Sequence, residues 1–287
     1  MMFGPVLHHD GLSRPLENPT LTVLSLGVGV QSSTLLLMAD RGELGRKPDV
    51  AIHAKLERSE PRAVGEYLEF LRATVSIPIV EVSAGSLYQE IIDASDGVAN
   101  AYARPPLFVI NERTGEVGFT RRQCTQGYKI EPITKAVREM LGLQRGRRGP
   151  KTPVVEQWIG ISTDEITRLK HSRFSYIHNR HPLIEARMSR RDCIRWLEER
   201  QYPVPPKSAC TFCPFHTNAM WRDIRDNDPE SWAQALEVDA ALARGLKNLK
   251  SRGYLHRTCK PLAEVDLGSP DAAGFDFANE CEGMCGV

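Results

Sequence analysis

The amino-acid sequence predicts an α/β fold with a doubly wound, mostly parallel sheet and a cysteine-bearing C-terminal region. From Leu21 onward, apolar segments with strand character alternate with helical segments, and the connections between them are short. Such alternation is typical of parallel strands joined by right-handed crossovers, which place ligands at the carboxyl ends of the strands. Beyond Tyr202 the chain becomes irregular and carries most of its cysteines.

The order of the elements follows from the apolar pattern. Strands are expected at 21–26, 49–54, 77–83 and 154–161, and helices at 32–42, 61–75, 134–143, 189–201 and 229–246. The first helix has Gly42 as a stop, and the second opens with Pro61 in its first turn. We expect a loose N-terminal arm (1–20), a nucleotide-binding α/β domain (21–200) with an inserted hairpin at about 104–119, and a C-terminal region (201–287) that ends in a mobile tail.

Composition excludes several classes of protein. The chain has 287 residues, of which 41% are hydrophobic and 25% charged, and its net charge is +1. No apolar run approaches the roughly 20 residues that span a bilayer, and the first residues lack the features of a signal peptide, so a cytoplasmic protein without a membrane partner is expected. Seven cysteines in a reducing compartment favour metal binding, chemistry or core packing over disulfides.

Charge is distributed unevenly along the chain. Residues 121–200 hold 18 Arg and Lys against 9 Asp and Glu. This excess is compatible with solvated helical faces, and it is equally what a surface for phosphates or nucleic acid would need.

A glycine-bearing turn, Gly27–Ser33 (GVGVQSS), joins the first strand to the first helix. Unpaired N–H groups and the helix dipole favour a phosphate at such a position. A Walker A loop requires a lysine, which is absent, and a dinucleotide fingerprint requires a third glycine and an acidic residue after the second strand. Here Ser32 replaces that glycine, and the second strand ends at Ala54 and Lys55. A strand-turn-helix unit without a ligand is the structural alternative.

The turn resembles the S-G-G-x-D-S-[ST] loop of the PP-loop ATP pyrophosphatases, which binds the β,γ-diphosphate of ATP and releases it as pyrophosphate. Gly29, Ser32 and Ser33 match, whereas Gly27, Val28 and Gln31 replace the first Ser, the first Gly and the Asp. Three later segments resemble the sulfonucleotide (APS and PAPS) reductases and their relatives: 121–137 (RRQCTQGYKIEPITKAV), 160–170 (GISTDEITRLK) and 207–215 (KSACTFCPF). The resemblance covers about residues 21–225 and implies the adenine-nucleotide α-hydrolase (HUP-like) fold, in its PAPS-reductase-like branch.

The resemblance also implies a metal centre. In cluster-bearing APS reductases a Cys-Cys pair joins a later C-x-x-C to hold a [4Fe–4S] cluster, and Gln123-Cys124 stands where that pair would be. The implied ligands are Cys124, Cys210 and Cys213. Three thiolates leave one iron open, which favours sulfur transfer over reduction, and zinc is the alternative metal. Cys193 and Cys259 are expected to be core residues.

The C-terminal tail, 279–287 (NECEGMCGV), resembles the mobile E-C-G end of sulfonucleotide reductases. Cys281 would then be a catalytic thiol or carry a persulfide, and Cys285 would supply a fourth cluster ligand or pair with Cys281. A frayed end with two idle thiols is the structural alternative.

The function implied by the resemblance is an ATP pyrophosphatase that adenylylates a nucleic-acid acceptor for sulfur incorporation, as in DNA phosphorothioation or tRNA thiolation. The expected nucleotide-binding residues are Gly27, Gly29, Gln31, Ser32, Ser33 and Asp164, with Ser32 also catalytic. Lys129 and Arg168 are the cations expected to stabilise charge, with Mg²⁺ bridging the phosphates. Asp164 and Glu165 either orient that metal or cap the following helix.

Two rival functions stay open. A sulfonucleotide reductase would use Cys281 to attack APS or PAPS and would cleave no ATP. A non-catalytic nucleotide-binding subunit of a modification complex would suit the loss of the loop's Asp and first Ser. The expected partners are DNA or tRNA and a sulfur donor such as a cysteine desulfurase, and a homodimer is compatible with the sequence.

Overall fold

A five-stranded parallel sheet forms the centre of the molecule. The computed structural model describes residues 14–98, 104–111, 113–245 and 252–268. The strands are β1 (Leu21–Ser25), β2 (Val50–Lys55), β3 (Ile79–Ser83), β6 (Val155–Ile159) and β7 (Ile177–Arg180). They pair in the order β3-β2-β1-β6-β7, and every pair is parallel. The predicted doubly wound α/β fold is therefore confirmed, with β1 at its centre.

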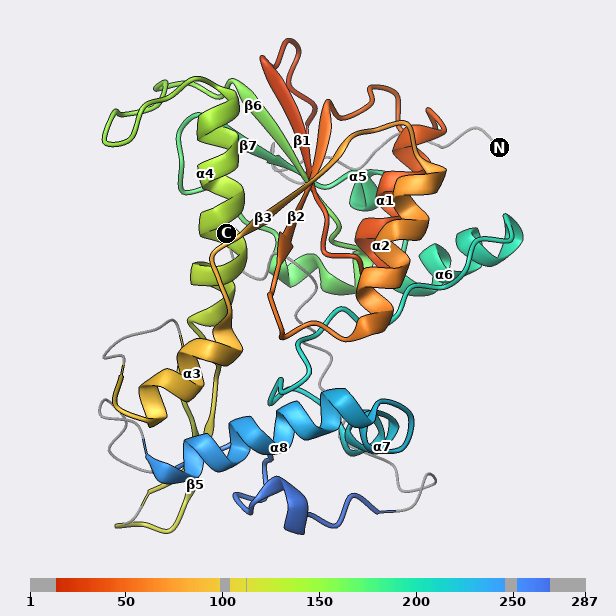
Figure 1. The fold of residues 1–287 in the computed structure, drawn as a ribbon. Coiled ribbons are helices and arrows are strands. Elements are labelled where there is room, and N and C mark those ends of the chain that lie inside the picture. Colours follow the sequence, from red (N-terminus) through yellow and green to blue (C-terminus); the bar gives the residue numbers. More distant parts are fainter. Residues whose placement is uncertain (1–13, 99–103, 112, 246–251, 269–287) are drawn as a thin grey trace.

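Helices cover both faces of this sheet (Figure 1). The helices α1 (Val30–Asp40), α2 (Arg62–Thr74) and α6 (Arg190–Glu199) share one hydrophobic core with β1, whereas α4 (Glu131–Met140) packs on the other face. In α2 the buried residues Val64, Tyr67, Leu68 and Leu71 follow the spacing of a single helical face. In α1 every residue from Val30 to Ala39 is buried, since helix, sheet and loops enclose it on all sides.

A second hydrophobic core lies below the carboxyl ends of the strands (Figure 1). It joins two segments that are distant in sequence. The first contains α3 (Leu87–Ser95) and the hairpin β4 (Phe108–Ile110) and β5 (Val117–Phe119), and it buries α3 and Leu107 in this core. The second contains α7 (Asn218–Asn227), α8 (Pro229–Arg244) and β8 (Gly253–Tyr254), and it buries residues of both helices and Leu255. The inserted hairpin is present, and β4 also pairs with β8. The C-terminal region thus packs on the insertion.

Several elements of the described residues were not expected from the sequence, among them β7, α3 and α7. The strand β7 was not expected, because His178, Asn179 and Arg180 give it little strand character, and polar partners inside the protein compensate their burial. The helices α3 and α7 were also not expected, although Ser86 and Thr217 cap their N-termini.

Among the described residues, no helix combines the length and the apolar character that a bilayer span requires.

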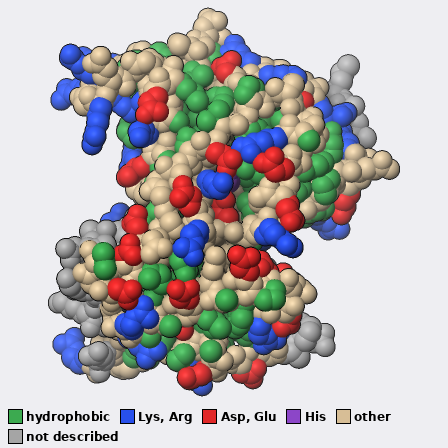
Figure 2. All heavy atoms as spheres, viewed as in Figure 1, with side chains coloured by type: hydrophobic (Ala, Val, Ile, Leu, Met, Phe, Trp, Pro, Cys, Tyr) green, Lys and Arg blue, Asp and Glu red, His purple; other side chains and the backbone are tan. Residues whose placement is uncertain are grey.

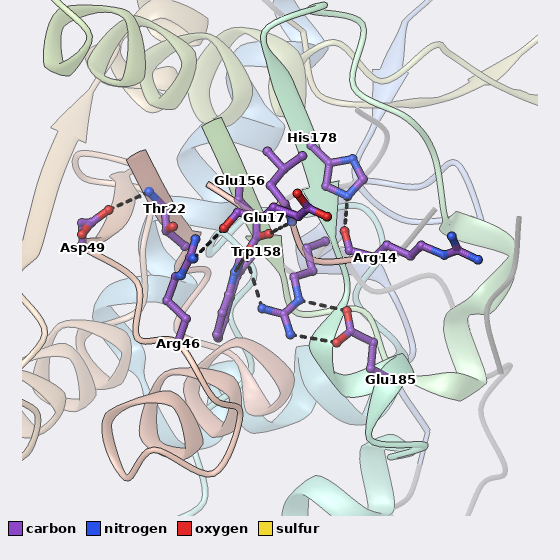
Figure 3. Close-up of polar contacts among 11 residues, drawn as sticks. Arg14, Glu17, Thr22, Arg46, Asp49, Glu156, Trp158, His178 and Glu185 are labelled. Carbon is purple, nitrogen blue, oxygen red and sulfur yellow. Dashed lines mark hydrogen bonds and ion pairs between the residues drawn. The ribbon is translucent and has the colours of Figure 1, made fainter. Parts of the chain in front are cut away.

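The described part of the expected N-terminal arm, residues 14–20, lies against the sheet (Figure 3). Its anchor is Glu156 on β6, whose side chain is 1% exposed. One carboxylate oxygen accepts the Leu16 N–H at 2.5 Å, and the other accepts Trp158 Nε1 at 2.7 Å and Arg180 Nη1 at 3.3 Å. Arg180 also binds Glu185 through two hydrogen bonds of 2.9 and 3.0 Å. A buried ion network therefore ties the arm to the sheet.

Replacing Glu156 with glutamine is expected to lower the free energy of unfolding by about 2 kcal/mol, because Arg180 and the Leu16 N–H lose a charged acceptor inside the protein. Glu185 still neutralises Arg180, so the loss stays below that of an unpaired buried charge. Urea denaturation measures the effect. The control is Glu66→Gln, which breaks an exposed ion pair with Arg62 and should change stability by less than about 0.5 kcal/mol. Equal effects of the two variants would contradict the prediction.

Candidate functional site

The glycine turn leaves the carboxyl end of β1 and leads directly into α1. Val28 has φ +59°, a left-handed conformation that is strained for a β-branched residue. Gly29 is extended at the N-cap, and its carbonyl accepts the Ser33 N–H at 3.0 Å. The Ser33 side chain is fully buried, and its hydroxyl has no hydrogen-bond partner among the described residues. The turn therefore holds a strained backbone and an unpartnered polar group where the sequence predicts phosphate binding.

Gly160, directly after β6, allows a close approach between two backbone segments at this turn. A Cβ atom at this position would lie 2.8 Å from the Ser32 nitrogen and 2.9 Å from its Cα. Both neighbouring atoms are backbone, so they have little freedom to move aside. Glycine at residue 160 therefore sets how closely the segment after β6 approaches the first turn of α1.

Gln31, which replaces the aspartate of the PP-loop pattern, is held at both ends of its amide. Its Nε2 donates to Ser162 Oγ at 3.3 Å and to Glu165 Oε2 at 3.2 Å. Its Oε1 accepts Arg190 Nη1 at 2.9 Å. An aspartate has no donor for the first two contacts, so the substitution is matched by its surroundings. Ser162 and Arg190 were not singled out from the sequence, where nothing marks them apart from their proximity to predicted residues.

The charged residues after β6 pair with one another in the structure. Arg168 forms an ion pair with Glu165 within the short helix η2 (Thr163–Arg168). Burial raises the pKa of Glu165, and the positive charge of Arg168 partly opposes that effect. The Asp164 carboxylate accepts the Arg190 N–H at 3.1 Å, at the start of α6. Asp164 therefore contacts the first turn of α6, the next helix expected from the sequence, where Ser189 is the N-cap. Its expected role in orienting a metal stays a prediction.

The three predicted metal ligands lie in one crevice between the sheet and the second core. We call it the thiol crevice; it is lined by Cys124, Cys210, Cys213, Leu56, Leu87, Pro105, Pro106, Arg122, Thr125, Lys129, Ala209, Pro214 and Phe215. Cys124 comes from the segment before α4, and the two other thiols come from the turn before α7. The fold thus brings together cysteines that are more than 80 residues apart in sequence. Lys129 lines the same crevice.

The thiols are close enough to affect one another's ionisation. A hydrogen bond with Cys213 and burial raise the pKa of Cys210 well above its ordinary value; negative charge on Cys213 and Cys124 raises it further, and the Lys129 ammonium lowers it. Among the described residues, no three His, Cys, Asp or Glu side chains converge as ligands of a single ion. The donor set fits a thiophilic centre in its chemistry. The thiolates of a cluster bind different irons, so they need not meet at one point.

One segment joins the glycine turn to the thiol crevice. The Ser208 hydroxyl donates to the carbonyl of Gly27, and Cys210 follows two residues later. The Thr211 N–H donates to the Ser59 carbonyl at 2.8 Å, which fixes the same segment to the loop after β2. Ser208 was not predicted as a site residue, and its place directly before the C-x-x-C is the signal that could have identified it. The segment that carries Cys210 is therefore hydrogen-bonded to the glycine turn.

His216 contacts the backbone of the C-x-x-C segment. Its Nε2 lies 2.9 Å from the Cys210 carbonyl, and its ring packs edge-on against Trp221. Burial lowers the pKa of His216 to about 4, so the ring is neutral at physiological pH. A neutral ring in this place leaves Lys129 and Arg122 as the cations that line the crevice.

The remaining predicted residues lie elsewhere. Cys193 is buried in the core between α1 and α6, as expected for a structural cysteine, and Cys259 is buried near the second core. Lys55 is exposed at the end of β2 and pairs with Glu81 at 3.5 Å. Cys281 and Cys285 lie outside the described residues, so their predicted roles stay predictions.

Part of the basic excess of residues 121–200 lies at the amino ends of the strands, opposite the end that carries the candidate site. Arg145, Arg147, Arg148 and Lys151 are exposed on the loop after α4, and Figure 2 shows Lys and Arg side chains gathered on that projection. This loop precedes the amino end of β6, whereas the glycine turn follows the carboxyl end of the parallel strand β1. A five-residue strand separates them by about 16 Å. The basic loop therefore does not border the candidate site.

Comparisons with known proteins include a similarity to a solved structure. No family model matches the chain, and no curated protein matches it. Among solved structures, the fold is similar to that of the U34-tRNA thiolase NcsA from Methanococcus maripaludis with its [4Fe–4S] cluster. The TM-score is 0.35 and the sequence identity 12%, over 88% of this chain and 83% of that chain. A similarity at this level does not carry an argument about function.

Proposed function

We propose that this protein cleaves ATP to AMP and pyrophosphate at the glycine turn and uses this activation to incorporate sulfur, held at the thiol crevice, into a nucleic-acid acceptor. The observation that carries the proposal is the hydrogen bond from Ser208 to the Gly27 carbonyl. It connects a helix N-terminus suited to phosphate with three thiols suited to a metal centre. Neither half alone would require the other, and together they match the two steps of activation and sulfur transfer.

At the turn, the backbone N–H groups of Gly29 to Ser32 and the hydroxyls of Ser32 and Ser33 would hold the leaving pyrophosphate. The acceptor oxygen attacks the α-phosphorus, the bond to the bridging oxygen breaks, and the AMP group moves to the acceptor. The sulfur nucleophile then displaces AMP. Two cations connect to the turn through Gln31: Arg190 donates to its amide oxygen, and Arg168 pairs with Glu165, which accepts from its amide nitrogen. Both would stabilise charge on the phosphates.

At the crevice, Cys124, Cys210 and Cys213 would hold a [4Fe–4S] cluster. A cluster bound by three protein thiolates offers one iron to an incoming sulfur species. Lys129, buried among the thiols, favours their ionised form and so assists ligand binding. Zinc in the same crevice would retain the ligands but remove this sulfur chemistry. DNA or tRNA would be the acceptor, and a cysteine desulfurase the sulfur donor.

The unpartnered hydroxyl of Ser33 provides a test of the turn. Ser33→Ala should lower kcat/KM for ATP cleavage about 10- to 100-fold, because a hydrogen bond to charged phosphate is lost. Stability should not fall, since this hydroxyl has no partner among the described residues. The matched control is Thr34→Val, which removes an equally buried and unpartnered hydroxyl one residue further along α1 and should leave activity unchanged.

The assay uses anaerobically purified protein with Mg-ATP, and it measures AMP, pyrophosphate, iron content and the visible spectrum of one sample. AMP and pyrophosphate from a brown, iron-containing protein support the proposal. Intact ATP in the presence of acceptor would overturn it. Sulfite released from PAPS would instead identify the protein as a sulfonucleotide reductase.

A further inference from the structure

An aromatic cluster lies at the rim of the thiol crevice, and we call it the aromatic rim: Phe108, Phe119 and Phe215, with Arg122. The ring centroids of Phe108 and Phe119 are 4.6 Å apart, and those of Phe119 and Phe215 are 5.4 Å apart with an edge-on geometry. The Arg122 guanidinium stands 5.5 Å from the Phe215 ring. Phe215 and Arg122 both line the crevice, so the rim is continuous with the thiols.

The aromatic rim is open to solvent on the side of β5. Phe119 is 44% exposed and Val117, which points to the same face of β5, is 54% exposed, whereas Phe108, the partner of Phe119 on β4, is only 8% exposed. Large apolar side chains that remain exposed beside a functional pocket indicate a binding surface.

The charge around the rim selects the class of ligand. The described residues that line the crevice include Arg122 and Lys129 and no carboxylate. Arg121, next to Arg122, is exposed. Aromatic rings combined with guanidinium groups bind the flat faces of nucleobases, while nearby cations contact the phosphates. A purely electrostatic nucleic-acid surface would not need exposed phenylalanine.

We propose that the aromatic rim stacks an unpaired nucleobase of the acceptor and places it at the mouth of the thiol crevice. This inference rests on the proposed function and deepens it, because it makes the base, and not the phosphate backbone, the part of the acceptor that enters the site. Enzymes that modify a base must first take it out of its stack. The rim provides the stacking partner that replaces the neighbouring bases, and Phe215 lines the crevice together with Cys213.

The test is binding of a short single-stranded oligonucleotide that carries one fluorescent 2-aminopurine, measured with the full-length protein. Stacking on the rim should quench the 2-aminopurine emission. Phe119→Ala should weaken binding about tenfold and remove the quenching, since one base-aromatic stack is lost. Phe119→Trp should restore both. An oligonucleotide with an abasic residue at the same position should bind wild type and Phe119→Ala equally.

Two controls separate this inference from general attraction and from the proposed function. Met140→Ala removes a side chain of similar exposure, 42%, at the end of α4, and should leave binding and quenching unchanged. The inference would be overturned if wild type and Phe119→Ala showed equal binding and equal quenching. It would also be overturned if the rim bound a protein and not the oligonucleotide. ATP cleavage and iron content are measured on the same samples. If wild type cleaves no ATP but quenching still depends on Phe119, the proposed function falls and the base-binding rim stands.

Discussion

Replacing Cys210 with serine is expected to lower the affinity for the cluster by at least about a hundredfold. The purified variant should therefore contain little iron and acid-labile sulfide, and it should not incorporate sulfur. Serine preserves the size of the side chain but not its soft thiolate, which is the donor that iron–sulfur clusters require. ATP cleavage to AMP and pyrophosphate should persist, because Cys210 does not belong to the glycine turn. Iron and sulfide analysis, the visible spectrum and a pyrophosphate assay on the same protein measure the three effects.

The matched control for this prediction is Cys259→Ser. Cys259 is also buried, and burial raises the pKa of its thiol, but it does not line the thiol crevice. This variant should keep the iron content of the wild type. A Cys210→Ser protein with unchanged iron would show that the crevice is not the ligand set. Zinc in place of iron in the wild type would keep the crevice as a metal site and reject the cluster.

Replacing Gly160 with alanine should destabilise the protein by about 2 kcal/mol, because the new methyl group would overlap the backbone of Ser32. The first turn of α1 must then move away from β6. A displacement of this kind misaligns the N–H groups of the turn, so kcat/KM for ATP cleavage should fall about a hundredfold. Thermal denaturation and steady-state kinetics separate the two effects.

Gly65→Ala is the control for Gly160→Ala. Gly65 is exposed in the middle of α2, and a Cβ there would meet no atom within 4 Å. Alanine should stabilise this helix by about 0.5–1 kcal/mol and leave ATP cleavage unchanged. If Gly160→Ala behaved like Gly65→Ala, the close approach after β6 would have no role in shaping the site.

The fold class and the main elements were predictable from local patterns. Short apolar runs separated by amphipathic helices implied parallel strands, and β1, β2, β3 and β6 lie where they were expected. The strand β7 was not predicted, because its burial depends on polar partners such as Lys170 and Glu185 that belong to other parts of the chain. Periodicity reports which residues face a core, and it does not register polar side chains that are compensated after folding.

The candidate site was predictable in its residue types and only partly in its geometry. The spacing of Cys210 and Cys213 indicates that both thiols bind one metal centre, but only the tertiary structure brings Cys124 into the same crevice. The sequence likewise suggests that Gln31 weakens the PP-loop pattern, whereas the structure surrounds this amide with Ser162, Glu165 and Arg190. Contacts between residues that are distant in sequence leave no local signal.

By itself, the sequence determined the parallel α/β architecture, the glycine turn at the end of β1 and the identity of the thiols, because these depend on spacing within one segment. The tertiary structure decided that Ser208, two residues before Cys210, is hydrogen-bonded to the glycine turn, and that the exposed basic loop lies at the amino end of β6, away from the turn. It also decided that Phe119 and Phe215 meet at the rim of that crevice. The physical reason is that packing between segments far apart in the chain sets these distances.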